Sequence, residues 1–243
     1  MSGHPAWAPD RSRIIYVSNK ETRPKRNIYT IAPDGSDPKR LTTAPDLDQW
    51  SPKYSPDMKP IVNVEIVEDD GSYIALMDPD GTNSRHIAGP YKFAEFPAWT
   101  RDGEQVYFAA IEQDRNDIDI YSVDIETREV KTIVSTPSAD VCPHFTRDGK
   151  TLTYASAAPG DSNNTDLFAR SLPFDSHTDI GDDVRLTTDP SFDDYSNTSP
   201  DDTRFVFLSR RDGNTELYLM DRDGENERRL TFTTELEENV PDW

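Results

Sequence analysis

Short apolar runs separated by polar turns recur along the whole chain. Near its end, three such runs follow one another: RFVFLS at 204–209, ELYLM at 216–220 and RRLT at 228–231. The first two combine aliphatic and aromatic residues and are too short for helices, so they favour strands. The Asp-Gly pairs between them supply the positive φ angles that tight hairpins need. This pattern predicts antiparallel strands joined by short turns.

The same order of strands is repeated five times. Each copy begins with a four-residue anchor, which reads WAPD, YSPD, WTRD, FTRD and TSPD in turn. The anchors start 45 to 53 residues apart, at Trp7, Tyr54, Trp99, Phe145 and Thr198. An insertion at 171–183 accounts for the longest step. A regular period of this length indicates one structural unit copied in tandem.

Each copy has four apolar stretches, which predict a four-stranded antiparallel meander. One such sheet cannot bury both faces alone, whereas copies packed face to face around an axis can. We therefore predict an all-β fold, a β-propeller of four-stranded blades with five repeats, and expect the anchor aromatics to pack between blades. A six-bladed ring completed by other material is the alternative. The prediction treats 1–243 as one domain, with an extra strand at 239–243 and repeats at about 5–51, 52–96, 97–142, 143–195 and 196–240.

The most regular copy spans 199–231 and reads SPDDTRFVFLSRRDGNTELYLMDRDGENERRLT. It resembles the repeat of the TolB-like propeller family: aromatic-Ser-Pro-Asp-Gly, an Ile-x-Phe-x-Ser strand, an Ile-Tyr strand, Asp-Gly and Leu-Thr. The resemblance implies a scaffold that binds a peptide or protein partner. The same repeat occurs in colicin-translocation proteins, peptidase gating domains and certain pectin lyases, so it identifies a fold more closely than a function. The resemblance to TolB proteins implies a six-bladed ring preceded by an N-terminal domain, whereas five repeats and no such domain are counted here.

The charge balance narrows the choice of partners. The chain has 46 acidic and 26 basic residues, for a formal net charge of -20. Such a surface repels phosphate backbones and anionic membranes, so it favours cationic or peptide partners over nucleic acid. The same excess of acids is typical of proteins adapted to high salt, a halophilic-type composition.

The remaining composition indicates a soluble protein without disulfides. Cys142 is the one cysteine, which excludes an intramolecular disulfide and a zinc site built from cysteines of this chain. No apolar run is long enough for a membrane span, and MSGHPAWAPD at the start lacks the pattern of a secretory signal. We expect a cytoplasmic protein, or a periplasmic or extracellular one whose signal has been removed.

The mouth of a propeller channel is the expected ligand site, because loops from every blade converge there. Residues near the innermost strand of each copy bring carboxylates and two histidines to that region, and carboxylates would attract a cation or a basic peptide. The alternative is that these acids are ordinary acidic surface. The candidate ligand-binding residues are His4, Asp48, Glu95, Asp140, His144, Asp194 and Glu238.

Metal binding is weakly supported by the pattern. His4 and His144 flank the proline of the innermost strand in copies one and four, on opposite sides of it. The similarity to pectin lyases, which coordinate a metal through several histidines, would require further ligands such as Glu95 or Asp140. The loops DPDGTN and DRDGEN do not follow the calcium-loop order, and hairpin turns explain them. We expect no cofactor, with calcium or another divalent metal as the alternative.

Three functions follow from these patterns. No G-x-S-x-G nucleophile elbow occurs, and Cys142 is interpreted as a small buried thiol. The leading hypothesis is a non-enzymatic scaffold that binds a peptide or protein at the channel mouth. One alternative is a metal-dependent polysaccharide lyase or hydrolase that uses the channel. The other is a structural propeller that oligomerises through free blade edges.

Overall fold

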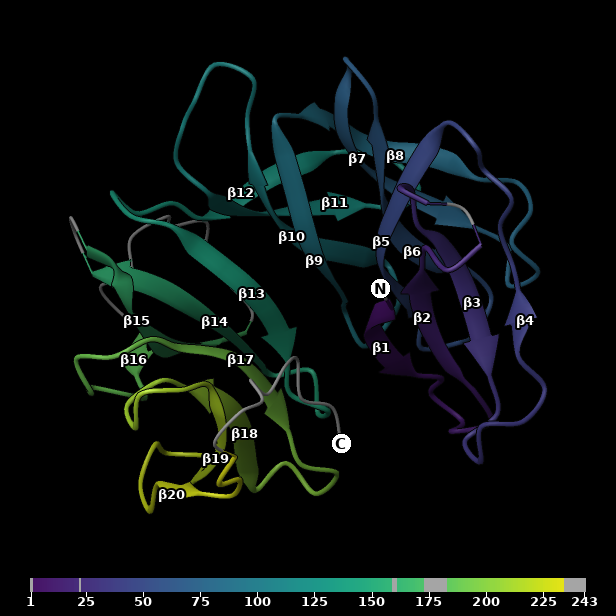
Figure 1. Ribbon diagram of the computed structural model, residues 1–243. Helices are drawn as coiled ribbons and strands as arrows, with labels where there is room; N and C mark the ends of the chain where they lie inside the picture. The colour runs from purple at the N-terminus through teal and green to yellow at the C-terminus, as the bar shows by residue number, and fades with distance from the viewer. Residues whose placement is uncertain (1, 22, 159–160, 173–182, 234–243) are drawn as a thin grey trace. The chain divides into compact units, whose positions relative to one another are not determined.

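The computed structural model of the protein describes residues 2–21, 23–158, 161–172 and 183–233. These residues form five four-stranded antiparallel sheets, in each of which the strands follow one another in chain order (Figure 1). The predicted all-β fold of five four-stranded propeller blades is therefore confirmed. Glu238 and the extra strand predicted at 239–243 lie outside the described residues. In the described part of the chain, no helix is long and apolar enough to span a bilayer.

Each blade begins with the strand that carries the anchor. Blade 1 contains β1 (Ser2–Trp7), β2 (Ile14–Ser18), β3 (Asn27–Ile31) and β4 (Lys39–Arg40). Blade 2 contains β5 (Leu47–Tyr54), β6 (Ile61–Val67), β7 (Gly71–Met77) and β8 (Arg85–Tyr91). Blade 3 contains β9 (Phe93–Trp99), β10 (Gln105–Ile111), β11 (Asp119–Asp124) and β12 (Val130–Val134). Blade 4 contains β13 (Asp140–Phe145), β14 (Thr151–Ala158), β15 (Asp161–Ser171) and β16 (Val184–Arg185). Blade 5 contains β17 (Asp193–Thr198), β18 (Arg204–Ser209), β19 (Glu216–Asp221) and β20 (Arg228–Arg229).

The chain divides into two compact units, each with its own core. Unit 1 is Met1–Asn116 with Ser122–Lys131, and unit 2 is Asp117–Tyr121 with Thr132–Trp243. In unit 1, blades 1 and 2 share a cluster of Ile15, Val17, Ile28, Ile61 and Met77. The anchor Tyr54 packs against this cluster. In unit 2, blades 4 and 5 share a cluster of Ala155, Leu167, Leu186, Phe205, Phe207, Tyr218 and Met220. Each of these blades thus buries its apolar face against a neighbour, as the repeat predicts.

The turns explain the recurring Asp-Gly pairs. Asp34 Oδ1 accepts hydrogen bonds from the backbone N–H of Ser36 at 2.9 Å and from its hydroxyl at 2.6 Å. Asp80 holds Thr82 in the same way, at 3.0 and 2.6 Å. Gly35, between Asp34 and Ser36, has a φ of 83°, which a residue with a Cβ adopts only with strain. The acids of these loops therefore stabilise hairpin turns.

Candidate functional site

The first strand of every blade contains a bulge at the same position. Its pairing with the second strand shifts register there, and the residue three positions before each anchor has a positive φ of 48° to 58°. The bulge residues are His4, Ser51, Phe96, Cys142 and Tyr195. Bulges redirect side chains at functional sites, so these positions are the natural place to look for chemistry.

In unit 1, three polar side chains from three successive blades meet at the bulges. Ser51 Oγ lies 3.0 Å from His4 Nδ1 and donates to Glu95 Oε1 at 3.5 Å. His4 Nε2 lies 3.6 Å from the same Glu95 oxygen. The side chains of His4 and Glu95 are 20% and 15% exposed, so a ligand can still reach them. The structure therefore brings two predicted site residues together, with Ser51 between them.

Burial sets the protonation of this cluster. It raises the pKa of Glu95 to about 7, against smaller opposing effects of the Ser51 hydrogen bond and the Arg26 charge. Burial also lowers the pKa of His4 to about 4, and the charges of Arg26 and Lys53 act in the same direction. Near neutral pH the histidine is therefore uncharged, and Glu95 is divided between its protonated and ionised forms.

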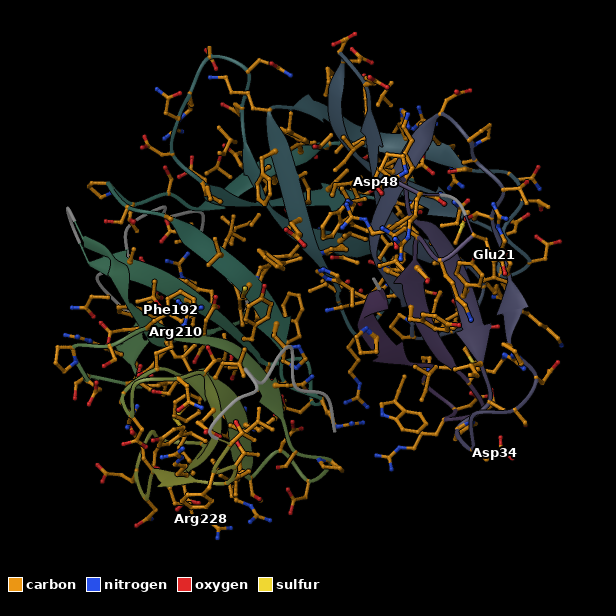
Figure 2. The ribbon with its side chains drawn as sticks, viewed as in Figure 1. Glu21, Asp34, Asp48, Phe192, Arg210 and Arg228 are labelled. Atoms are coloured by element: carbon orange, nitrogen blue, oxygen red, sulfur yellow. The ribbon has the colours of Figure 1, made fainter. Side chains whose placement is uncertain are left out.

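Asp48 forms an ion pair with Arg26, which belongs to the same unit. Arg26 donates from Nε to Asp48 Oδ1 at 2.9 Å and from Nη2 to Oδ2 at 2.5 Å. The same guanidinium lies 3.1 Å from the centre of the Trp50 ring, whose Nε1 donates to Asp48 at 3.1 Å. Burial tends to raise the pKa of Asp48, but the hydrogen bonds from Arg26 outweigh it and hold the pKa below its usual value. Asp48 (Figure 2) is thus held in a bidentate ion pair with Arg26 and is not a free carboxylate for a ligand.

In unit 2, Asp194 is buried beside the bulge residue of the preceding blade. Burial raises the pKa of Asp194 to about 6, although a hydrogen bond with Cys142 and the charge of Arg210 oppose that rise. Arg210 lies over the ring of Phe192, 4.8 Å from its centre (Figure 2). Cys142 is buried, which confirms the interpretation of a small buried thiol.

Asp140 belongs to a hydrogen-bond network that joins blade 4 to the connection before it. It accepts from Ser156 Oγ at 2.6 Å, and from the backbone N–H and hydroxyl of Thr136 at 2.8 and 3.2 Å. Burial raises the pKa of Asp140 to about 6 despite these bonds. Asp193 has the matching place in blade 5, and Thr187 supplies the hydrogen bond there. These carboxylates anchor connections between blades.

The other predicted residues do not join this cluster in unit 1. His144 is on β13 in unit 2, opposite Thr153, whereas His4 is on β1 in unit 1. Glu238 lies outside the described residues. Within residues 2–21, 23–158, 161–172 and 183–233, no group of three or more His, Cys, Asp or Glu residues is arranged to hold a metal ion.

Sequence reasoning missed two features. Ser51 is not among the predicted site residues, although it precedes a proline on the first strand as His4 does. The second is a buried ion pair in unit 2, in which Arg170 Nε lies 2.7 Å from Asp183 Oδ1 and the side chains are 9% and 1% exposed. Asp183 ends the insertion at 171–183, so no repeat pattern could indicate its partner.

Comparisons with known proteins agree with this architecture. A family model described as the TolB beta propeller domain matches residues 65–243. YuxL of Bacillus subtilis (strain 168), an uncharacterised peptidase, is 28% identical over 109 residues, which are 42% of this chain and 16% of that protein. The chain thus spans a small part of this relative.

Two solved structures share the fold. TolB from Acinetobacter baumannii aligns with a TM-score of 0.75 at 23% identity, over 93% of this chain and 54% of that chain. An oligogalacturonate lyase in complex with manganese aligns with a TM-score of 0.64 at 14% identity, over 93% of this chain and 64% of that chain. Because this fold occurs both in TolB and in a lyase, function has to be argued from the site.

Proposed function

The chain belongs to the TolB β-propeller domain family, and from that premise we propose that it is a scaffold that binds a peptide or protein partner through a basic residue placed against Glu95. The observation that carries the proposal is the set of contacts around this carboxyl group. Its side chain is 15% exposed, and in the described part of the chain no lysine or arginine lies within ion-pair distance of it. A buried carboxylate without a cation is costly, and a partner's Lys or Arg would supply the missing charge.

The neighbours of Glu95 suit the donors of a guanidinium or ammonium group. Neutral His4 accepts a hydrogen bond through one ring nitrogen and Ser51 through its hydroxyl oxygen, and both side chains reach within 3.6 Å of the Glu95 oxygen. The formal net charge of -20 attracts basic segments over a longer range, and salt screens that attraction. The local acceptors therefore supply selectivity, and the overall charge increases the rate of encounter.

Binding at this site should be linked to the protonation of Glu95. Its pKa is raised to about 7 by burial, and a cation bound beside it favours the ionised form. Affinity for a basic peptide should therefore rise with pH up to about 7 and then level off, with about a tenfold change per pH unit below that value. A ligand held only by the acidic surface would lack this dependence.

The test uses an array of peptides whose only charged residue is one arginine. The same peptides with citrulline in place of the arginine are the controls. Peptides that bind at high salt are then titrated with the wild-type protein, Glu95→Gln and Glu104→Gln, an exposed glutamate of the same blade. We expect Glu95→Gln to weaken arginine-dependent binding about tenfold or more and Glu104→Gln to leave it unchanged. Equal binding by both variants, or no preference for arginine over citrulline, would overturn the proposal.

Native mass spectrometry of protein purified without added metal or chelator separates the alternative functions. A monomer without adducts agrees with the scaffold. A stoichiometric metal adduct that is lost in His144→Ala would favour a metal-dependent lyase or hydrolase. A defined oligomer would favour association through free blade edges.

A further inference from the structure

A cavity of about 460 Å³ opens on unit 1 beside β8, the outermost strand of blade 2. We call it the β8 cavity. Its walls are residues 87–91 of β8, residues 112–114 after β10, Arg128 in the turn before β12 and Val130 at the start of β12. Its volume is in the range of sites for small organic ligands. None of its walls belongs to the cluster of His4, Ser51 and Glu95, so binding in the β8 cavity is independent of the function proposed for Glu95.

The edge of β8 is unsuited to pairing with another strand. Pro90 has no backbone N–H to donate, and the pairing of β8 with β7 shifts register twice. Gly89 has a φ of 112°, and a Cβ there would lie 2.8 Å from the carbonyl oxygen of Ser72. Irregular backbone of this kind blocks the addition of an extended peptide. A ligand of the β8 cavity would therefore be held by side chains.

Residues of both charge signs line the β8 cavity, two of them at exposed positions. Glu112 and Asp114 contribute carboxylates and Arg128 contributes a guanidinium. None of the three has an ion-pair partner within the described ranges of the chain. The backbone of Arg128 is fixed by a turn, because its N–H donates to Asp124 O at 2.9 Å. These groups are thus available to a ligand that has both an amine and a carboxylate.

Apolar surface accompanies these charges. Ile87 is a buried part of the lining, and Val130 is 41% exposed, so both a buried and an accessible aliphatic side chain border the cavity. Tyr91 adds an aromatic ring to the lining. The pKa of its phenol is raised to about 12, mainly by burial and to a smaller extent by the charge of Glu112. The Glu112 charge is therefore close enough to affect the ionisation of this phenol.

We propose that the β8 cavity binds a small zwitterion of the dipeptide type, with its ammonium group at Glu112 and Asp114, its carboxylate at Arg128 and an apolar side chain against Val130. A purely cationic ligand would meet Arg128, and a purely anionic one would meet two carboxylates. A zwitterion satisfies both signs, and charge-assisted hydrogen bonds to both ends would select it. The apolar residues of the lining favour a ligand with an aliphatic or aromatic side chain over one with glycine alone.

The test is calorimetric titration of the full chain with leucyl-leucine, and with two analogues that each lack one charge: N-acetyl-leucyl-leucine and leucyl-leucine amide. We expect each analogue to bind about tenfold or more weakly than the zwitterion. Arg128→Gln should abolish the advantage of the free carboxylate and keep that of the amine. Glu112→Gln should reduce the advantage of the amine and keep that of the carboxylate, and Glu126→Gln, an exposed position in the nearby turn, should change neither.

Because each variant is compared across three ligands, a general loss of folding cannot imitate this pattern. Equal binding of the three compounds to the wild-type protein, or the absence of saturable binding of leucyl-leucine, would overturn the proposal. So would an Arg128→Gln variant that still prefers the free carboxylate.

Discussion

The hydroxyl of Ser51, on the bulge of β5, reaches across to the Glu95 carboxylate on the first strand of the next blade, 3.5 Å away. In unit 2 the equivalent contact joins Cys142, on the bulge of β13, to Asp194 on the first strand of the next blade. There the thiol donates to the carboxylate. In both places a bulge residue contacts the residue that precedes the next bulge. The repeated backbone thus creates equivalent positions, and the side chains decide whether a carboxylate there is enclosed, as Asp194 is, or still partly open, as Glu95 is.

Glu95→Gln should stabilise the protein at alkaline pH. Burial raises the pKa of Glu95 to about 7 from its usual 4.5, so the folded protein holds a proton that the unfolded chain releases between these values. Its contribution to stability is therefore lost as the pH rises from about 4.5 to about 7. The uncharged glutamine lacks this loss, and we expect the free energy of unfolding at about pH 8 to rise by up to about 3 kcal/mol. Urea unfolding across this pH range measures the effect.

His4→Gln provides the control of opposite sign. Burial lowers the pKa of His4 to about 4 from 6.5, so the folded protein loses stability as the pH falls through this range. The variant should therefore unfold less readily than the wild type at acid pH and should show no gain at alkaline pH. Parallel pH curves for the wild type and both variants would contradict the buried positions of the two residues.

Gly81→Ala and Gly35→Ala should separate backbone strain from contact between blades. Both glycines have nearly the same conformation, with φ values of 87° and 83°. A Cβ at Gly35 would meet nothing within 4 Å, whereas one at Gly81 would lie 2.2 Å from the backbone oxygen of Leu41 in the neighbouring blade. We expect Gly35→Ala to cost about 1–2 kcal/mol for its left-handed conformation alone. Gly81→Ala should cost about 1–3 kcal/mol more, because backbone has to move. Equal losses in thermal or urea unfolding would rule out this contact.

Thr187→Val should destabilise blade 4 and its connection to blade 5 without creating a cavity. Thr187 is fully buried, and its hydroxyl accepts the backbone N–H of Leu167 at 3.0 Å while also bonding to Asp193. Valine has the same shape but leaves the N–H unsatisfied, at a cost of about 1–3 kcal/mol. The adjacent Thr188 is exposed, so Thr188→Val is the matched control and should change stability little. If the two variants unfold alike, the hydroxyl of Thr187 makes no structural contribution.

The number and kind of blades could be predicted from the sequence because their signals are local. Strand residues alternate with Asp-Gly turns, and the anchors set the period, so no knowledge of distant contacts is required. Turns such as that at Asp34 hold themselves together with hydrogen bonds between residues two positions apart. Such contacts can be expected from neighbouring residues alone.

The arrangement of the site could not be predicted in the same way. Glu95 and Asp140 have similar places in the sequence repeats, but Glu95 is one residue before its bulge and Asp140 is two before. Side chains of successive strand residues point to opposite faces, so Glu95 meets Ser51 whereas Asp140 meets the network around Thr136. The bulge residues are not glycines, and so their positive φ has no clear sign in the sequence.

Substitutions of Trp99 should test how blades 2 and 3 are joined within unit 1. The indole Nε1 of Trp99 donates to the backbone oxygen of Lys53 on β5 at 3.3 Å, so the anchor contributes both a ring and a hydrogen bond. Trp99→Phe keeps an aromatic ring and should cost about 1 kcal/mol for the lost donor. Trp99→Ala also removes the packing and should cost about 3–5 kcal/mol. Phe232→Ala, at a side chain that is 73% exposed and lies under the Arg229 guanidinium, is the control and should change the free energy of unfolding by about 1 kcal/mol at most. If Trp99→Ala unfolds in urea like the control, Trp99 does not hold blades 2 and 3 together.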